Sequence, residues 1–194
     1  QAERFGANIR PVAVTAVDFS ASPYSVTLDD GSTLTALSVI IATGASAKYL
    51  GLPAEETYRG TGVSACATCD GFFYRKKTVA VVGGGDTACE EASYLAGLAA
   101  KVYLIVRKPF LRASKAMQER VLSNPKIEVR FETNVTDLQG DGGVESATIV
   151  FKQGTPEEQV STLPIDGLFL AIGHTPNSLL FRPWIKTAEA GHII

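Results

Sequence analysis

Two cysteines stand at a spacing that supports chemistry, in the segment Cys66-Ala67-Thr68-Cys69. A C-x-x-C pair beside a βαβ pattern indicates redox chemistry or metal binding. A structural zinc site needs four ligands, and the other Cys and His residues (Cys89, His174 and His192) lack partners at ligand spacing. We therefore favour a redox dithiol, with a zinc site or two unrelated buried cysteines as the alternatives.

Asp70 directly follows the second cysteine. A carboxyl beside a dithiol can carry a proton to or from the leaving thiolate if its pKa is raised towards neutrality. Asp70-Gly71 is equally a common turn dipeptide, and spacing alone does not decide between the two roles. Cys89 is expected to be a small buried hydrophobic residue rather than a reactive thiol.

A glycine-rich turn supplies a second chemical signal. Gly83, Gly84, Gly85 and Ala88 form the dinucleotide fingerprint G-x-G-x-x-A. Gly83 permits the tight turn, Gly85 lets a pyrophosphate approach the backbone, and Ala88 allows close packing of helix on strand. The following helix would present free N–H groups to the pyrophosphate. The alternative is a purely structural glycine turn.

Basic residues follow the second strand of this unit, where Arg107-Lys108 is followed closely by Arg112. A site for NAD usually places Asp or Glu about 20 residues after the glycines, to bind the ribose hydroxyls. No carboxylate is present at this strand end, whereas cations suit a 2′-phosphate. The sequence thus predicts a preference for NADPH over NADH, with a solvated basic loop as the alternative.

The elements that position these residues follow from hydrophobic patterning. The β-branched run 78–82 and the run 101–106 predict buried parallel strands. Between them, Ala88, Ala92, Leu95 and Ala99 recur at helical spacing and predict one buried stripe. Together these segments make a βαβ unit.

The remaining chain predicts further elements on both sides of this unit. An antiparallel meander is expected first, with Asp30-Gly31 as a hairpin turn, followed by a buried strand and a connector rich in Gly, Pro and charge. The ranges are strands 12–18, 24–28, 33–37 and 39–44, connector 51–62, helix 113–123, strand 127–131, hairpin 134–154, and strand 168–172, which ends at residues 173–177.

Composition excludes several classes of protein. The 194 residues allow one or two domains, and the 45% apolar content allows a sizeable core. A formal net charge of −2 gives no electrostatic reason to expect nucleic acid or an anionic membrane as partner. No apolar run approaches the roughly 18 residues that span a bilayer, and no signal-peptide core opens the chain. With three cysteines and no disulfide framework, we expect a cytoplasmic protein.

Taken together, the motifs closely resemble the low-molecular-weight thioredoxin reductases over nearly the whole chain. The segments that carry the resemblance are Ala-Cys-Ala-Thr-Cys-Asp-Gly at 65–71, Gly-Gly-Gly-Asp-Thr-Ala-Cys-Glu-Glu-Ala at 83–92, Arg107-Lys108 with Arg112-Ala113, Ala-Thr-Gly-Ala at 42–45, and Ala-Ile-Gly-His-Thr-Pro-Asn at 171–177. One departure is Val106-Arg107-Lys108, where the family often has His-Arg-Arg. Lysine keeps the charge but loses the two-pronged geometry.

The resemblance implies an α/β protein in which a Rossmann-like NADPH-binding domain, with a parallel sheet, helices and a β-meander, is inserted in an FAD domain. Residues 61–164 would form the NADPH domain, and 1–60 and 165–194 would be parts of the FAD domain. The family's opening glycine fingerprint and its C-terminal Gly-Asp segment are not among these residues, so we expect a fragment. The full-length enzyme would be a homodimer.

The resemblance also implies roles for residues. Electrons would pass from NADPH through FAD to the Cys66–Cys69 disulfide and on to thioredoxin, with Cys69 facing the flavin, Cys66 attacking thioredoxin and Asp70 donating the proton. A hinge rotation would alternate the two domains. The implied cofactor contacts are Gly83, Gly84, Gly85, Asp86, Thr87, Arg107, Lys108, Arg112, Ile172 and Gly173 for NADPH, and Thr43 and Gly44 for FAD. No metal is expected.

Three other functions remain open from the sequence. The chain could serve a peroxiredoxin as its flavoprotein reductase, could be an NADP(H)-binding module without catalysis, or could be a zinc-stabilised interaction domain.

Overall fold

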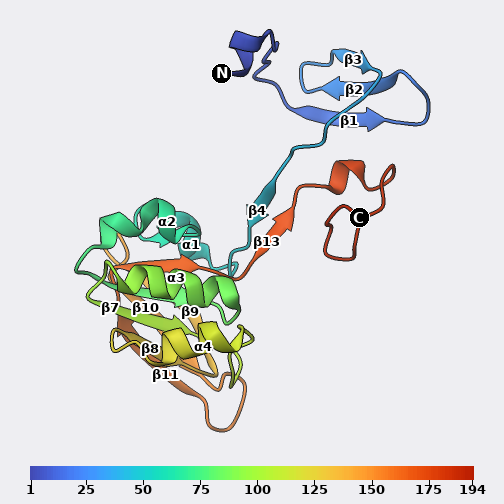
Figure 1. Ribbon diagram of the computed structural model, residues 1–194. Coiled ribbons are helices and arrows are strands. Elements are labelled where there is room, and N and C mark those ends of the chain that lie inside the picture. The colour runs from blue at the N-terminus through green and yellow to red at the C-terminus, as the bar shows by residue number, and fades with distance from the viewer. The chain divides into compact units, whose positions relative to one another are not determined.

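The structure is a computed structural model that describes residues 1–194. The chain divides into two compact units (Figure 1): unit 1 comprises Gln1–Ser46 and Thr175–Ile194, and unit 2 comprises Ala47–His174. The predicted α/β class is confirmed, because unit 2 contains a parallel sheet together with helices. The assignment of FAD and NADPH domains at residues 60 and 164 stays a prediction.

Unit 2 is built on a five-stranded parallel sheet in the order β5-β12-β6-β7-β8. The four strands predicted at 78–82, 101–106, 127–131 and 168–172 are confirmed, with slightly different ends. The bounds are β5 Val63–Ser64, β6 Thr78–Val82, β7 Lys101–Ile105, β8 Ile127–Arg130 and β12 Gly167–Leu170.

Both faces of this sheet are buried, as the apolar runs predict. On β6, Val79 and Val81 pack into one hydrophobic cluster, while Ala80 and Val82 pack into another. The first cluster contains the apolar stripe of α3 (Asp86–Ala96), and the second contains side chains of an antiparallel sheet. Unit 2 therefore has a central sheet covered by helices on one face and by strands on the other.

The structure also contains four α-helices and three short 3-10 helices. The predicted buried stripe is confirmed, since Ala88, Ala92 and Leu95 of α3 are fully buried and Ala99 nearly so. The bounds are α1 Pro53–Thr57, α2 Ala67–Asp70, α3 Asp86–Ala96, α4 Lys115–Leu122, η1 Ala2–Phe5, η2 Gly71–Tyr74 and η3 Leu179–Phe181. No helix combines the length and the apolarity that crossing a membrane requires.

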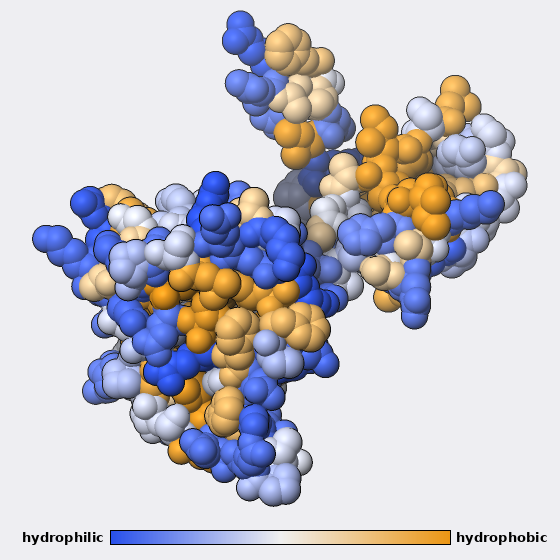
Figure 2. Space-filling model, turned by 60° about the horizontal axis from the view of Figure 1, so that its bottom comes forward, coloured by the Kyte–Doolittle hydropathy of each residue, from blue (hydrophilic) through white to orange (hydrophobic).

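The covering strands form a meander in the order β11-β10-β9. The bounds are β9 Thr133–Gln139, β10 Ser146–Phe151 and β11 Gln159–Pro164. The hairpin predicted at 134–154 is confirmed by the antiparallel pairing of β9 with β10, and β11 adds a third strand. The face of unit 2 seen in Figure 2 has apolar side chains gathered among hydrophilic ones.

Unit 1 contains the predicted meander, with Asp30-Gly31 at its hairpin turn. Its strands are β1 Val14–Asp18, β2 Tyr24–Leu28 and β3 Thr33–Ala36, in that spatial order. Phe19 contacts the rings of Tyr24, Phe181 and Trp184, which gives this unit an aromatic cluster. A further pair of strands, β4 Ala45–Ala47 and β13 His174–Pro176, lies where the chain passes from one unit to the other.

The buried strand predicted at 39–44 is wrong. These residues have no regular secondary structure, and Ile40 is 91% exposed. A buried parallel strand requires hydrogen-bonded neighbours on its edges, and no strand in the structure pairs with this segment. The apolar run therefore lacks the neighbouring strands with which it could form a sheet.

Candidate active site and nucleotide pocket

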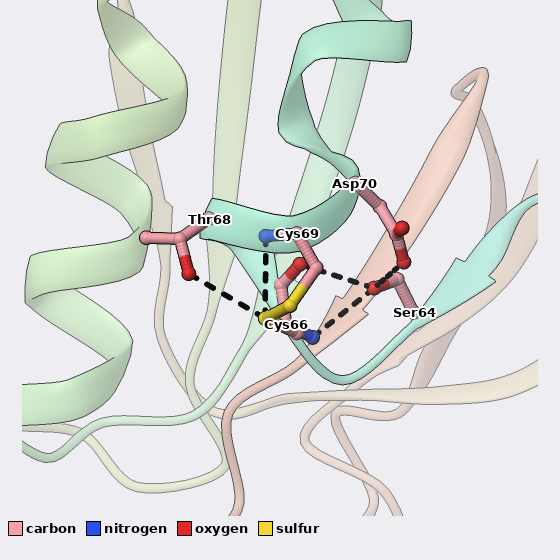
Figure 3. The surroundings of a disulfide bond; sticks show 5 residues. All are labelled: Ser64, Cys66, Thr68, Cys69 and Asp70. Atoms are coloured by element: carbon pink, nitrogen blue, oxygen red, sulfur yellow. Dashed lines mark hydrogen bonds between the residues drawn. A yellow bond between two sulfur atoms is a disulfide. The ribbon is translucent and has the colours of Figure 1, made fainter. Parts of the chain in front are cut away.

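The two cysteines of the C-x-x-C segment form a disulfide at the start of helix α2 (Figure 3). Cys66 is the residue that caps this helix, and its Sγ accepts the backbone N–H of Cys69 at 3.2 Å. Cys66 is half-buried and Cys69 is exposed. The pairing predicted for the dithiol is present, and one sulfur lies against a backbone N–H that can stabilise a negative charge.

Ser64 links this turn to Asp70. Its Oγ donates a hydrogen bond to Asp70 Oδ2 at 2.7 Å and accepts one from the backbone N–H of Cys66 at 3.1 Å. The same Oγ lies 3.4 Å from the carbonyl oxygen of Cys66. Ser64 is the last residue of β5 and is 7% exposed, so the sheet fixes the position of this hydroxyl. The residue was not singled out from the sequence, where only its proximity to Cys66 could have indicated it.

The third cysteine behaves as the sequence predicts. Cys89 is free, fully buried on α3 and part of the hydrophobic cluster beneath the helix. Burial raises the pKa of its thiol, and the nearby Asp86 carboxylate raises it further. Both effects favour the neutral thiol, which is the unreactive form.

The glycine turn between β6 and α3 has distinct constraints at each position. Gly83 has φ of 149°, and a Cβ there would lie 2.4 Å from the carbonyl oxygen of Ala171 and 2.7 Å from Ala88 Cβ. Gly85 has nothing within 4 Å of such a Cβ, so its Cα faces open space. Gly83 and Ala88 therefore provide close packing, while Gly85 leaves the backbone accessible to a ligand.

This open space is part of a hollow of about 510 Å³. It lies at the carboxyl ends of β6, β7 and β12, where ligands bind in doubly wound sheets. Nine of the predicted nucleotide-contacting residues line it: Gly83, Gly84, Gly85, Thr87, Arg107, Lys108, Arg112, Ile172 and Gly173. The glycine turn and the predicted phosphate-binding cations thus share one cavity.

Asp86 has a different place from the other predicted contacts. It is not among the residues that line the hollow, and its Oδ1 accepts the backbone N–H of Ser114 at 2.9 Å. This hydrogen bond lowers the pKa of the carboxyl. Asp86 therefore holds the residue that caps α4 against the start of α3.

Several residues of the hollow were not singled out from the sequence. Val106 and Ala171 lie at the C-terminal ends of predicted strands and could have been inferred from them. Thr133 and Asn134 come from the antiparallel strand β9, and only the tertiary arrangement brings them to the parallel sheet. Phe110 is 56% exposed and also lines the hollow, so an aromatic face is available there.

The residues predicted to contact FAD belong to unit 1. Thr43 Oγ1 donates to the carbonyl oxygen of Asn177 at 2.6 Å, and the Asn177 side-chain amide donates back to the carbonyl of Thr43 at 3.0 Å. The backbone N–H of Asn177 donates to the carbonyl of Gly44. These contacts join the motif segments 42–45 and 173–177 through residues that belong to unit 1.

Comparison with known proteins supports the resemblance carried by the motifs. A curated relative from Pseudomonas fluorescens, named glucosaminate ammonia-lyase, is 48% identical over 100% of this chain and 60% of its own length. The thioredoxin reductase of Eremothecium gossypii is 46% identical over 100% of this chain and 61% of its own. The solved structure of thioredoxin reductase from Giardia duodenalis superimposes with a TM-score of 0.81 at 38% identity, covering 98% of this chain and 62% of that one.

The chain thus spans about 60% of the length of the relatives it matches. The sequence model for the family described as pyridine nucleotide-disulphide oxidoreductase matches residues 2–194. With the disulfide, the glycine turn and the basic hollow in the positions that the motifs predict, we conclude that the chain belongs to the pyridine nucleotide-disulphide oxidoreductase family.

Proposed function

We propose that this chain contains the NADPH-binding and dithiol-bearing part of a flavin-dependent thioredoxin reductase. The observation that carries the proposal is the Cys66–Cys69 disulfide in the same unit as a basic dinucleotide hollow. The relatives named thioredoxin reductase and the family match support it.

The residues of the hollow fit a pyridine dinucleotide. Its volume of about 510 Å³ lies within the range of cofactor sites. Gly85 leaves open space at the N-terminus of α3, where free N–H groups can bind a pyrophosphate. Arg107, Lys108 and Arg112 supply the cations that a 2′-phosphate requires, so NADPH is the proposed ligand.

Bound NADPH and FAD would supply a hydride and carry its two electrons to the disulfide. The chain's own residues do the remaining chemistry. The Cys66–Cys69 bond accepts two electrons and two protons to become a dithiol, and Cys66 then attacks one sulfur of a thioredoxin disulfide as the thiolate. Cys69 then attacks the Cys66 sulfur of the resulting mixed disulfide and displaces the thioredoxin thiolate, which takes up a proton; the Cys66–Cys69 bond is restored and thioredoxin leaves as a dithiol.

Asp70 is proposed to move the proton in these exchanges. A thiolate leaving group needs a proton, and the Asp70 carboxyl is held by Ser64, which also binds the Cys66 backbone. Thr43 and Gly44 are proposed FAD contacts on the basis of the family motif. Thioredoxin is the proposed partner, and a peroxiredoxin-system protein is the alternative disulfide substrate.

The first experiment is the visible absorption spectrum of the purified 194-residue chain, followed by addition of NADPH. A flavin band that NADPH bleaches, together with NADPH-dependent reduction of thioredoxin, is the result expected of a reductase. A colourless protein that binds NADPH limits this chain to the module without catalysis. In that case Cys66→Ser and Cys69→Ser are tested in the complete protein, where retained thioredoxin reduction by either variant contradicts the proposal.

The name of the Pseudomonas fluorescens relative supports a second candidate activity, ammonia release from glucosaminate. Elimination of ammonia transfers no electrons to a disulfide, so Cys66 and Cys69 would have no role in it. An assay for ammonia with glucosaminate separates the two candidates. Activity that survives Cys66→Ser would favour the lyase, and no ammonia release with intact thioredoxin reduction would exclude it.

A further inference from the structure

A second hollow of about 470 Å³ adjoins the nucleotide hollow. The two share Arg107, Lys108 and Asn134, so the second hollow lies directly beside the first on unit 2. The opposite wall of the second hollow comes from the loop between β10 and β11, which contributes Lys152 and Glu157. Neither residue is part of the nucleotide fingerprint.

The backbone fixes Lys152 beside the phosphate-binding cations. The N–H of Glu132 donates to the carbonyl of Lys108 at 3.3 Å, and the N–H of Lys152 donates to the carbonyl of Glu132 at 2.8 Å. Glu132 and Lys152 have φ of 51° and 46°, a conformation that is uncommon outside glycine. Two consecutive hydrogen bonds thus hold an unusual backbone that keeps Lys152 next to Lys108.

The loop that follows Lys152 is also held by hydrogen bonds among its own residues. Thr155 donates to the carbonyl of Lys152 through both its N–H, at 3.2 Å, and its Oγ1, at 2.8 Å. The N–H of Glu157 donates to Thr155 Oγ1 at 3.2 Å. This turn returns the chain so that the carboxylate of Glu157 forms an ion pair with the ammonium of Lys152.

The charges of the second hollow favour a dianion. Its cations are Arg107, Lys108 and Lys152, and its carboxylates are Glu132 and Glu157. The Lys152 side chain is 29% exposed, whereas that of Glu157 is 67% exposed. Glu157 can therefore leave the pair at low cost, because an exposed ion pair contributes little to stability. A phosphomonoester would replace one carboxylate charge by about two negative charges.

We propose that Lys152 is a further specificity-determining residue for NADPH. The second hollow receives the 2′-phosphate side of the adenosine, and Lys152 adds a cation to those already assigned to this phosphate. Glu157 holds Lys152 until the phosphate displaces the Glu157 carboxylate. The proposal rests on the proposed function, because it requires NADPH in the adjoining hollow. It also accounts for Lys108 in place of a two-pronged arginine, since a second ammonium compensates for the lost contact.

Titration calorimetry of the 194-residue chain with NADPH and NADH tests the proposal without activity as the readout. Lys152→Gln should weaken NADPH binding about three- to tenfold, the effect of one partly exposed charge contact. Glu157→Gln should strengthen NADPH binding about two- to fivefold, because it removes the competing carboxylate. NADH affinity should not change in either variant.

Two matched controls have the same charge changes away from the hollows. Lys76→Gln removes a lysine with φ of 61°, and Glu56→Gln removes the carboxylate of an exposed ion pair with Arg59. Both should bind NADPH as the unmodified chain does. Circular dichroism and thermal unfolding check that each variant folds, and if Lys152→Gln does not fold, the increase expected for Glu157→Gln carries the test alone.

The outcomes separate this inference from the proposed function. If the unmodified chain does not prefer NADPH over NADH, or if Arg107→Gln leaves the preference intact, the proposed nucleotide site fails and the inference fails with it. If Arg107→Gln abolishes the preference while Lys152→Gln and Glu157→Gln match their controls, the site stands. The Lys152 proposal is then overturned, and its ion pair only stabilises the loop.

Discussion

The hydroxyl of Ser64 touches both the backbone of Cys66 and the carboxyl of Asp70. A hydroxyl has one proton to donate and two lone pairs to accept with. Ser64 can therefore donate to the Asp70 carboxylate, or accept from the protonated acid while donating to the Cys66 carbonyl 3.4 Å away. Either protonation state of Asp70 can be held in one place, which suits a group that moves a proton.

We predict that Ser64→Ala in the complete enzyme slows dithiol–disulfide exchange with thioredoxin about tenfold. The loss should be smaller than that of Asp70→Asn, because Asp70 is the proposed general acid and removal of such a group costs roughly 100-fold or more. Stopped-flow measurement of exchange against pH should show a displaced profile for Ser64→Ala. Ser64→Thr, which keeps the hydroxyl, should restore it.

Thr68→Ala removes the other hydroxyl near the dithiol and serves as the comparison. Its Oγ1 lies 3.5 Å from Cys66 Sγ and makes no hydrogen bond to Asp70, so this variant separates an effect on the thiol from an effect on the carboxyl. An unchanged pH profile in Ser64→Ala would show that Ser64 only stabilises the turn.

Cys89 provides a prediction about thiol reactivity. Its buried position and raised pKa reduce both access and the thiolate fraction at any given pH. After reduction, the folded chain should expose two fast-reacting thiols to an aromatic disulfide reagent at about pH 8, where an unperturbed thiol is already substantially ionised. A third should react only in denaturant, and Cys89→Ala should abolish that third equivalent alone.

At the level of elements, the glycine turn between β6 and α3 combines two roles within three residues. One glycine is needed for close packing, and another leaves space for a ligand. We predict that Gly83→Ala destabilises the chain by about 2–6 kcal/mol, because it adds overpacking of roughly 1–3 kcal/mol to backbone strain of roughly 1–3 kcal/mol. Gly85→Ala should cost less than about 1 kcal/mol, since only the preference for glycine over alanine at a helix cap is lost. Denaturant unfolding measures both.

For NADPH affinity the order of the two effects should be reversed. Gly85→Ala places a methyl group in the open space above the turn, so it should weaken NADPH binding at least about tenfold, the equivalent of roughly 1.4 kcal/mol. Gly83→Ala, under conditions in which it is folded, should bind NADPH with an affinity closer to that of the unmodified chain. If Gly85→Ala binds NADPH normally, the pyrophosphate does not lie against this turn.

The sequence predicted those elements whose signals are local. The strand–glycine–helix unit, the C-x-x-C pair, the burial of Cys89 and the meander at Asp30-Gly31 all follow from residues close together in the chain. The strand predicted at 39–44 was wrong because a buried strand also needs neighbouring strands. The apolar composition of the segment does not show whether such neighbours exist, and no strand in the structure pairs with it. Asn134 and Lys152 were missed because an antiparallel sheet, folded onto a parallel one, brings Asn134 to the nucleotide hollow and Lys152 to the second hollow beside it.

At the level of the whole molecule, the position of β12 in the sheet differs from its order in the sequence. It comes after the meander, yet it lies between β5 and β6, and its Leu168 and Phe169 are fully buried. We predict that a chain ending at residue 164 does not fold, because a buried central strand is lost and two strand edges are exposed. Residues 47–174 should remain soluble and folded, as measured by circular dichroism and size-exclusion chromatography.

The same arrangement fixes an order of events on the ribosome. The strands β5, β6, β7 and β8 are all synthesised before β12, and β5 joins the sheet only through β12. The end of β5 is Ser64, so the anchor of the dithiol turn cannot be set until about a hundred residues more have been made. Among the five strands of this sheet, the one that ends at the disulfide turn is therefore the first to be translated and the last to be paired.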